Sequence, residues 1–378
     1  MTASGEMMRP TWCEINLGAL GRNFDVIRKR VSNSMVMPVI KADAYGHGIE
    51  KIGLHLERLG ADRLAVAYVE EGVVLREAGV TIPIHVMGGA IKRQIPLFLD
   101  HDLIFTAPSI EKLEQINDAA KTRGLKAVVH LKIDTGMERI GVHHYKAESF
   151  LLASLKCESI IVEGVFSHFA RADETNLSSA LLQLERFNQV LEFYDKKNLP
   201  TPLRHISNSG GIAQIPDANL DIVRPGILMF GVYPSPETQR TVAVEPVLSW
   251  HSEVIYFKVV EAGNPVSYGG TWQPDKQTRV VTLPVGYADG YRRDLSNCAE
   301  VLVRGQRYPV VGRVCMDQTM LDIGTGTAYN GDVVTLIGSD GDHSISAEDL
   351  AEWSGTIPYE VLASISARVP RVYVDSAK

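Results

Sequence analysis

The sequence predicts an α/β protein with an N-terminal (β/α)8 TIM-like barrel followed by a C-terminal, mainly β domain. Up to about residue 240, short runs rich in Val and Ile alternate with amphipathic stretches. Beyond Pro246, apolar and polar residues alternate between turns of Gly, Pro, Asn and Asp. The length of 378 residues also favours two domains, because single hydrophobic cores rarely grow beyond about 250–300 residues.

Eight apolar runs in the first part are predicted to be strands. They are mostly continuous in hydrophobicity, which is typical of parallel strands that are buried on both faces. Eight strands followed by helices indicate a (β/α)8 barrel. The runs are 35–40, 63–69, 84–88, 103–107, 127–133, 161–168, 203–207 and 222–228.

Three of the stretches between these runs show the spacing of helices that bury one face. Their apolar stripes cover 49–59, 113–120 and 184–194, and each is followed by a helix-stopping residue, namely Gly60, Gly124 and Pro200. Glycine and proline are typical residues just beyond a helix. These stripes predict core packing rather than chemistry.

The second part is predicted to contain alternating strands at 253–260, 279–283, 300–303, 318–323 and 333–337. Ser346 with Asp349 three residues later predicts a capping box at the start of a helix, and Pro358 suits the first position of another. The expected domains are 1–243, the barrel, and 244–378, the mainly β domain. We expect the N-terminal strand to join the β domain.

Composition excludes several classes of protein. The net charge of -7, with no basic block to offset it, argues against a nucleic-acid partner. No apolar run approaches the roughly 20 residues of a membrane span, and the first residues lack the apolar segment of a secretory signal. The four cysteines are scattered without metal-ligand spacing, so we expect no metal site, no disulfides and a cytoplasmic location.

One lysine, Lys41, directly follows the first apolar run, where a buried strand would end. Keeping such an amine neutral at pH 7 is costly, because lowering its pKa from about 10.4 to about 7 costs about 4.6 kcal/mol. Condensation with an aldehyde to form a Schiff base avoids much of that cost and creates a reactive centre. The alternative is a lysine that extends to solvent from a strand end.

Polar residues also follow the other predicted strands. In (β/α)8 barrels the C-terminal ends of the strands meet on one rim, and the loops after strands seven and eight commonly bind phosphate. Such a rim suits an anionic cofactor that carries an aldehyde. The residues are Lys41 and Tyr45, then Lys132, Asp134 and Arg139, then His168, then His205, Asn208 and Ser209, and finally Arg224 with Gly226 and Ile227.

A series of motifs runs through the chain: VIKADAYGHG, LKIDTGMERIG, GVFSHFARAD, SNSGG, VRPGI, VSYGGTW, GYADGY, GRVCMDQTMLDIG and PYE. This series resembles that of the bacterial alanine racemases, the fold type III enzymes that use pyridoxal 5′-phosphate (PLP). The resemblance covers essentially the whole chain. The lysine motif alone occurs in other PLP-dependent barrels, whereas the full series is highly specific.

The resemblance implies that Lys41 holds PLP and acts as one of two catalytic bases, and that Tyr268 acts as the other. Racemisation requires protonation on the face opposite to abstraction, so two groups on opposite sides are the simplest design. In the family this tyrosine reaches the barrel site of the other subunit, which implies a homodimer with shared active sites. Without the motif, Tyr268 would be interpreted as an ordinary strand tyrosine.

Further roles are implied by the same resemblance. Arg224 would face the pyridine nitrogen, Arg139 would contact the phenolic oxygen of the cofactor and the substrate carboxylate, and Met316 would offer its amide to that carboxylate. Arg171 stands where the family usually has a small residue, and we expect it to narrow or charge the entrance. The remaining residues are Tyr45, His168, Asn208, Ser209, Gly226, Ile227 and Tyr359 at the cofactor, and Lys132 (carbamylated in some family members), Asp317 and Tyr287 as support or entrance.

The implied activity is interconversion of L-alanine and D-alanine, which supplies D-alanine for peptidoglycan. Two other functions remain open. A non-catalytic PLP carrier shares the barrel but lacks a β domain, and a PLP-dependent decarboxylase would carry a C-terminal cysteine-aspartate signature instead of GRVCMDQ. A racemase of broad specificity is a closer alternative, although such enzymes are usually exported.

Overall fold

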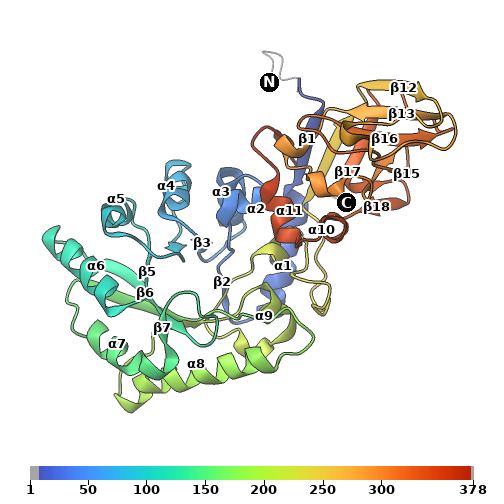
Figure 1. Ribbon diagram of the computed structural model, residues 1–378. Coiled ribbons are helices and arrows are strands. Elements are labelled where there is room, and N and C mark those ends of the chain that lie inside the picture. Colours follow the sequence, from blue (N-terminus) through green and yellow to red (C-terminus); the bar gives the residue numbers. More distant parts are fainter. Residues whose placement is uncertain (1–7, 376–378) are drawn as a thin grey trace. The chain divides into compact units, whose positions relative to one another are not determined.

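The computed structural model describes residues 8–375, which divide into two compact units (Figure 1). One unit is Gly21–Val244, here called the barrel unit. The other, here called the β unit, combines the residues up to Leu20 with those from Glu245 onward. Helix α1 (Leu17–Val31) contains the division between them.

The barrel unit contains eight parallel strands that form a closed circuit. Regular pairing joins β3 to β4, joins β5, β6, β8 and β9 in that order, and joins β10 to β2. Single bridges from Val39 to Ala65 and from His85 to Ile104 join the remaining neighbours, and Asp221 N donates to Arg204 O (3.1 Å) between β9 and β10. The strands are β2 (Met35–Val36), β3 (Leu64–Val66), β4 (Ile84–Val86), β5 (Phe105–Ala107), β6 (Ala127–Asp134), β8 (Ile160–Phe166), β9 (Leu203–His205) and β10 (Ile222–Val223).

Each of the eight predicted runs overlaps one of these strands, so the predicted barrel is confirmed. The three predicted stripes lie in α3, α6 and α8, and their apolar faces are buried. The helices of this unit after α1 are α2 (Lys41–Gly46), α3 (Ile49–Arg58), α4 (Val69–Glu77), α5 (Ile95–Asp100), α6 (Ile110–Thr122), α7 (Ala147–Ser154), α8 (Ser178–Lys196) and α9 (Ser209–Gln214), and β7 (Val142–His143) is a short strand that pairs with β6.

The β unit contains two sheets. A seven-stranded sheet has the order β15, β14, β17, β11, β1, β19, with β18 paired to β17, and a three-stranded sheet has the order β12, β13, β16. Trp250 is fully buried in this unit. The strands are β1 (Thr11–Asn16), β11 (Leu248–Glu253), β12 (Tyr256–Val260), β13 (Thr278–Leu283), β14 (Glu300–Val303), β15 (Gln306–Pro309), β16 (Thr319–Gly324), β17 (Val333–Asp340), β18 (His343–Ile345) and β19 (Arg371–Val374).

The predicted strand 253–260 is wrong at its start. The chain leaves the larger sheet after Glu253 and enters the smaller sheet at Tyr256, so the run belongs to two strands. The predicted capping box is confirmed, because Ser346 Oγ accepts from Asp349 N (3.0 Å) at the start of α10 (Ala347–Ser354). Pro358 begins α11 (Pro358–Ser364). None of the helices within residues 8–375 has the length and apolar character that crossing a membrane requires.

Candidate functional site

Lys41 lies at the start of an unusual turn in the barrel unit. The four residues Ala42 to Tyr45 all adopt left-handed backbone angles, with φ between 52° and 54°. Left-handed conformations cost roughly 1–2 kcal/mol for each residue that carries a side chain, so surrounding contacts must hold this turn. Lys41 follows the first barrel strand, as expected, but the sequence did not predict the left-handed turn that begins there.

Two carboxylates hold this turn. Glu71 on α4 accepts from the amide of Ala42 (2.6 Å) and, through its other oxygen, from the amides of Ala67 (2.8 Å) and Tyr68 (3.1 Å). Asp43 Oδ1 accepts from the amide of Ile49 at the start of α3 (2.8 Å). Bonds to backbone amides stabilise carboxylates as charged groups, and here they fix the direction in which Lys41 leaves the backbone.

A cavity of about 330 Å³ is lined by four of the predicted site residues, Lys41, Lys132, Arg139 and His168. Burial lowers the pKa of Lys41, the charge of Arg139 lowers it further, and Glu71 opposes both effects. A lysine with a lowered pKa has more neutral amine, which is the nucleophilic form. The cavity therefore holds an amine suited to condensation with an aldehyde, beside a cation suited to a carboxylate.

Lys132 and His168, which line the same cavity, also have lowered pKa values. Burial, followed by the charge of Arg224, lowers the pKa of each well below its ordinary value. Lys132 Nζ is buried and has no hydrogen-bond partner among residues 8–375, and it lies 4.7 Å from the centre of the Phe166 ring. An unpartnered buried amine is costly, so this position favours a group that would supply the missing hydrogen-bond partner.

Arg224, which directly follows β10, is 2% exposed and is held on two of its three nitrogens. Its Nη1 lies 2.7 Å from His205 Nδ1, and its Nη2 donates to Ser167 O (2.8 Å) and lies 3.1 Å from His168 Nδ1. Its Nε is buried and has no partner within the described part of the chain. The guanidinium thus keeps one unused donor, which suits a ligand atom that accepts a hydrogen bond.

Ser209, Gly226 and Tyr45 form a small cradle in the same unit. Ser209 Oγ accepts from the amides of Gly226 (2.9 Å) and Leu228 (3.3 Å). A Cβ at Gly226 would lie 2.5 Å from Tyr45 Oη, so a larger residue there would displace the tyrosine or the backbone. Asn208 Oδ1 accepts from the amide of Gly211 (3.0 Å) and caps α9, of which Ser209 is the first residue. Hydroxyls and amides gathered at a helix start suit a phosphate.

The loop that carries Arg139 is organised by Asp134 at the end of β6. Its Oδ1 accepts from the amides of Gly136 (2.8 Å) and Met137 (3.0 Å), and its Oδ2 accepts from that of Arg139 (3.2 Å). Although burial alone would raise the pKa of Asp134, these bonds lower it. Arg139 is exposed, but its backbone is therefore held in a defined loop.

Arg171 does not present a free charge. Its Nε donates to both carboxylate oxygens of Glu174 (2.7 and 2.8 Å), and its Nη2 donates to one of them (2.5 Å). The side chain is exposed. The expected effect of this arginine on the entrance is therefore reduced, because its guanidinium is neutralised within its own loop.

In the β unit, Tyr268 lies in a short 3₁₀ turn (Tyr268–Gly270), and 73% of it is exposed. Ser267 before it has a φ of 67°, which is strained for a residue other than glycine. Ser267 Oγ donates to Arg313 O (2.6 Å) and lies 3.4 Å from Cys315 Sγ. The turn that presents the tyrosine is thus tied to the segment that leads into Met316.

Tyr287 and Met316 lie on two segments of the β unit that are joined through their backbones. Tyr287 N donates to Cys315 O, and Ala288 N donates to Met316 O, both at 3.0 Å. A Cβ at Gly286 would lie 2.3 Å from Cys315 O, so this close approach requires glycine. Both predicted side chains are exposed, Tyr287 by 42% and Met316 by 53%.

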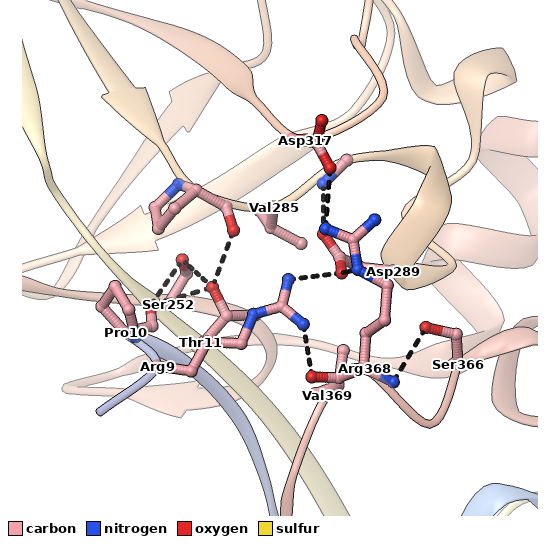
Figure 2. Close-up of polar contacts among 12 residues, drawn as sticks. Arg9, Pro10, Thr11, Ser252, Val285, Asp289, Asp317, Ser366, Arg368 and Val369 are labelled. Carbon is pink, nitrogen blue, oxygen red and sulfur yellow. Dashed lines mark hydrogen bonds and ion pairs between the residues drawn. The ribbon is translucent and has the colours of Figure 1, made fainter. Parts of the chain in front are cut away.

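A network of charges supports these two segments (Figure 2). Asp289 is fully buried and accepts from the amide of Gly286 (3.0 Å). Its other oxygen pairs with Arg9 and lies 3.4 Å from Arg368 Nε. Arg368 Nη2 donates in turn to Asp317 Oδ1 (2.7 Å). The network connects the first described residues to Asp317, the neighbour of Met316.

The structure brings the barrel residues of the prediction together, because Lys41, Lys132, Arg139 and His168 share one cavity and the Arg224–His168 contact joins it to the held guanidinium. Tyr359 lies half-buried in α11 of the β unit. The sequence reasoning missed Glu71, Asp289 and Arg368. A signal for Glu71 existed, because it lies three residues after the N-cap of α4, where capping boxes place a glutamate.

The fold is that of a barrel protein with a second, mainly β unit, and its cavity contains an amine suited to an aldehyde. The sequence model of the alanine racemase N-terminal domain matches residues 15–234, and that of the alanine racemase C-terminal domain matches residues 247–373. The chain therefore belongs to the alanine racemase family.

Known relatives agree over nearly the whole chain. An alanine racemase of Halothermothrix orenii is 44% identical over 367 residues, with 97% of each chain covered. The structure of the alanine racemase of Clostridium difficile 630 is similar with a TM-score of 0.92 at 37% identity, covering 98% of this chain and 97% of that one. The alanine racemase of Bartonella henselae, solved with covalently bound pyridoxal phosphate, is similar with a TM-score of 0.88 at 28% identity, covering 97% and 99%.

The residues of the barrel unit fit PLP. The amine of Lys41 suits the aldehyde, the cradle at Gly226 suits the phosphate, and the unused Nε of Arg224 suits an accepting ring nitrogen. These are three separate chemical features of one cofactor, and each is matched by a group that the fold of the barrel unit itself holds in place.

Proposed function

We propose that this protein is a PLP-dependent alanine racemase, which interconverts L-alanine and D-alanine and supplies D-alanine for peptidoglycan. The observation that carries the proposal is the cavity in which Lys41, with its lowered pKa, lies beside Arg139 and His168. Membership of the alanine racemase family, with both domains matched, supports it further. A carrier without a β domain is disfavoured by the match to residues 247–373.

The cofactor would be held at its aldehyde carbon, its phosphate and its ring nitrogen. Lys41 would bind it covalently, while Tyr45, Ser209 and the backbone of Gly226 and Ile227 would bind its phosphate. When bound, PLP withdraws electrons from the α-carbon of an attached amino acid and makes its proton acidic. Arg224 can only donate, so it would leave the ring nitrogen unprotonated and limit this electron withdrawal. That limit favours racemisation over transamination. Asn208, His168 and Tyr359 complete the proposed cofactor contacts.

Lys132 is proposed to carry a carbamate. Its lowered pKa favours the neutral amine, whose lone pair attacks carbon dioxide, forms an N–C bond and releases one proton. The product is an anion where the unmodified residue would be an unpartnered buried amine. Because Arg139 lines the same cavity, the new negative charge would orient that guanidinium toward a substrate carboxylate. Arginine matches a carboxylate with two parallel bonds.

Two bases would act on opposite faces of the substrate. Lys41 Nζ would hold or remove the α-proton on one face, and the phenolic oxygen of Tyr268 would do so on the other. The amide of Met316 would bind the substrate carboxylate and Asp317 would support it, while Tyr287 and Arg171 would lie at the entrance. Small substrates such as alanine would pass this entrance most easily.

The active protein is proposed to be a homodimer in which each Tyr268 serves the barrel site of the other chain. Tyr268 lines a cavity of about 640 Å³ on the β unit, and the nearby strand β12 exposes Tyr256, Phe257 and Val259 by half or more. Monomers rarely expose apolar patches of this kind. A second copy of the chain would cover them. The cytoplasmic location of the proposal is supported by the four cysteines, all of which are free.

Racemisation of several amino acids in deuterated water, followed by chiral chromatography, tests this proposal. The wild-type protein should interconvert both alanine enantiomers with exchange of the α-proton. Lys41→Ala should lose both the visible absorption of bound PLP and the activity. Borohydride treatment followed by peptide mapping should place the cofactor on residue 41. The proposal would be contradicted if neither alanine enantiomer exchanged its α-proton. It would also be contradicted if borohydride fixed the cofactor on another lysine.

A further inference from the structure

A chain of hydrogen bonds crosses the interior of the barrel unit from Arg224 to Glu163. Arg224 Nη1 lies 2.7 Å from His205 Nδ1, and His205 Nε2 lies 2.7 Å from His130 Nδ1. His130 Nε2 then lies 2.9 Å from Glu163 Oε2. Both histidines are fully buried. Arg63 ends the chain with two bonds to the carboxylate of Glu163 (2.6 and 3.0 Å).

The direction of this chain follows from the chemistry of its ends. An arginine can only donate, so Arg224 makes His205 Nδ1 an acceptor and leaves the proton of that ring on Nε2. That proton makes His130 Nδ1 an acceptor in turn, and places the proton of His130 on Nε2. The carboxylate of Glu163 can only accept, which fits this arrangement. Both rings are therefore neutral, and burial indeed lowers the pKa of each.

The backbone makes room for the chain at two points. The pairing of β6 with β8 passes from Val129–Val162 to His130–Gly164, so Glu163 is an extra residue in β8. Such bulges redirect side chains and occur often beside active sites. A Cβ at Gly164 would lie 2.7 Å from His130 Nδ1. Glycine at this position therefore leaves the space that the ring of His130 occupies.

We propose that Glu163, His130 and His205 are positioning residues, which hold the guanidinium of Arg224 in one orientation through a hydrogen-bond chain of fixed direction. This inference rests on the proposed function for its consequence: the Nε of Arg224 stays turned to the cofactor. Burial, followed by the charge of Arg139, lowers the pKa of Arg224 to about 9. A fixed acceptor for its Nη1 favours the protonated guanidinium against that tendency.

A metal ion is the competing interpretation, because one nitrogen from each of His85, His130 and His205 lies within 4.8 Å of the others. The hydrogen bonds disfavour it. His85 Nε2 lies 3.0 Å from the hydroxyl of Thr106, which itself donates to Val86 O (2.8 Å) and so must accept from His85. The facing nitrogens of His130 and His205 are already joined at hydrogen-bond distance. His85 is thus a buried neighbour outside the chain.

Two matched variants separate the chain from the ion pair at its end. Glu163→Leu and Arg63→Leu both break the Arg63–Glu163 pair, but only the first removes the acceptor of His130. The readout is the ¹⁵N NMR spectrum of the histidine rings in the full-length protein, without and with PLP, which reports the protonated nitrogen of each ring. His85→Phe serves to assign the neighbouring signals.

The wild-type protein should show His130 and His205 as neutral rings protonated on Nε2, with or without PLP. Glu163→Leu should shift the ¹⁵N signal of His130 Nε2, which loses its acceptor, whereas Arg63→Leu should keep the wild-type pattern. Removing an outer hydrogen-bond partner of a metal-ligating histidine typically weakens binding by at least about tenfold, and Glu163 is an outer partner of Arg224 in the same sense. We therefore expect PLP to bind about tenfold more weakly to Glu163→Leu, and less than about threefold more weakly to Arg63→Leu.

A doubly protonated ring or an Nδ1-protonated ring in the wild type would overturn the proposal, and so would identical spectra and PLP affinities for the two variants. Should Glu163→Leu fail to fold, His130→Phe removes the acceptor of His205 directly and must shift the ¹⁵N signal of His205 Nε2. Failure of the proposed function is distinguishable, because a wild-type protein that binds no PLP would still report the tautomers of both rings.

Discussion

The two units carry their proposed site residues in opposite ways. In the barrel unit, Arg224 and Lys132 are only 2% and 3% exposed, and neighbouring strands and loops hold the surrounding groups. In the β unit, Tyr268 is 73% exposed and Met316 is 53% exposed. The barrel unit therefore holds Arg224 and Lys132 within its core, whereas the β unit presents Tyr268 and Met316 on its surface.

Replacement of the exposed base should have the largest effect. Tyr268→Phe keeps the ring but removes the phenolic oxygen, and loss of a general acid–base group lowers kcat by about 10²–10⁴-fold. The absorption of bound PLP should not change, because Lys41 lies in the barrel unit. Steady-state racemisation with both enantiomers measures this loss. Tyr329→Phe, which alters another exposed tyrosine of the β unit, is the control and should keep full activity.

The buried carboxylate behind the exposed surface should matter for stability. Asp289→Asn keeps a side chain that can accept from Gly286 N but removes the negative charge between Arg9 and Arg368. We expect the free energy of unfolding to fall by about 1–3 kcal/mol, and the KM for alanine to rise as Asp317 loses its support. Urea unfolding measures the first effect. Asp294→Asn, in an exposed ion pair, should change stability by less than about 0.5 kcal/mol.

A methyl group in the cradle of the barrel unit should weaken cofactor binding. In Gly226→Ala the new Cβ would lie 2.5 Å from Tyr45 Oη, so the phosphate-binding backbone or the tyrosine must move. We expect the dissociation constant of PLP to rise by about tenfold, which is a cost near 1.4 kcal/mol. Gly21→Ala in α1, where the new Cβ meets only Leu59 at ordinary contact distance, is the control. Equal affinities in the two variants would contradict the proposed cradle.

The barrel unit should also lose stability in acid. Burial is the first cause that lowers the pKa values of His85, His130, His168 and His205. The unfolded chain takes up protons at these residues below about pH 6.5, whereas the folded chain does not, so the folded state is destabilised as the pH falls. Each histidine contributes up to about 1.4 kcal/mol per pH unit where the pH lies well below about 6.5, and about half of that at about pH 6.5. Unfolding of the protein without PLP between pH 7.5 and 5.5 measures the slope, which His85→Phe should reduce.

The smallest effect is expected at Arg171. Because Glu174 already pairs with its guanidinium on the exposed surface, Arg171→Ala should leave stability almost unchanged. The KM values for alanine and serine should change in the same proportion. A selective gain for serine would show that the arginine controls the entrance after all.

The barrel could be predicted because strands buried on both faces are continuously apolar. Residues such as Val129 and Leu131 are typical of such strands, and both are fully buried. The β unit was harder, because β11 alternates Leu248, Trp250 and Ser252 inward with polar residues outward, and its end merges in sequence with β12. The sequence placed Lys41 directly after the first apolar run, but it did not predict the left-handed turn that follows. Neither Ala42 nor Ala44 prefers such angles, and contacts from Glu71, on another helix, impose them.

Mixing of two inactive chains tests the central claim most directly. Lys41→Ala and Tyr268→Phe would be purified separately, unfolded together, refolded with PLP and assayed for alanine racemisation. If Lys41 of one chain works with Tyr268 of its partner, a mixed dimer contains one complete site, and the mixture regains activity that neither variant has alone. A mixture that forms mixed dimers yet stays as inactive as its components would contradict the shared two-base site.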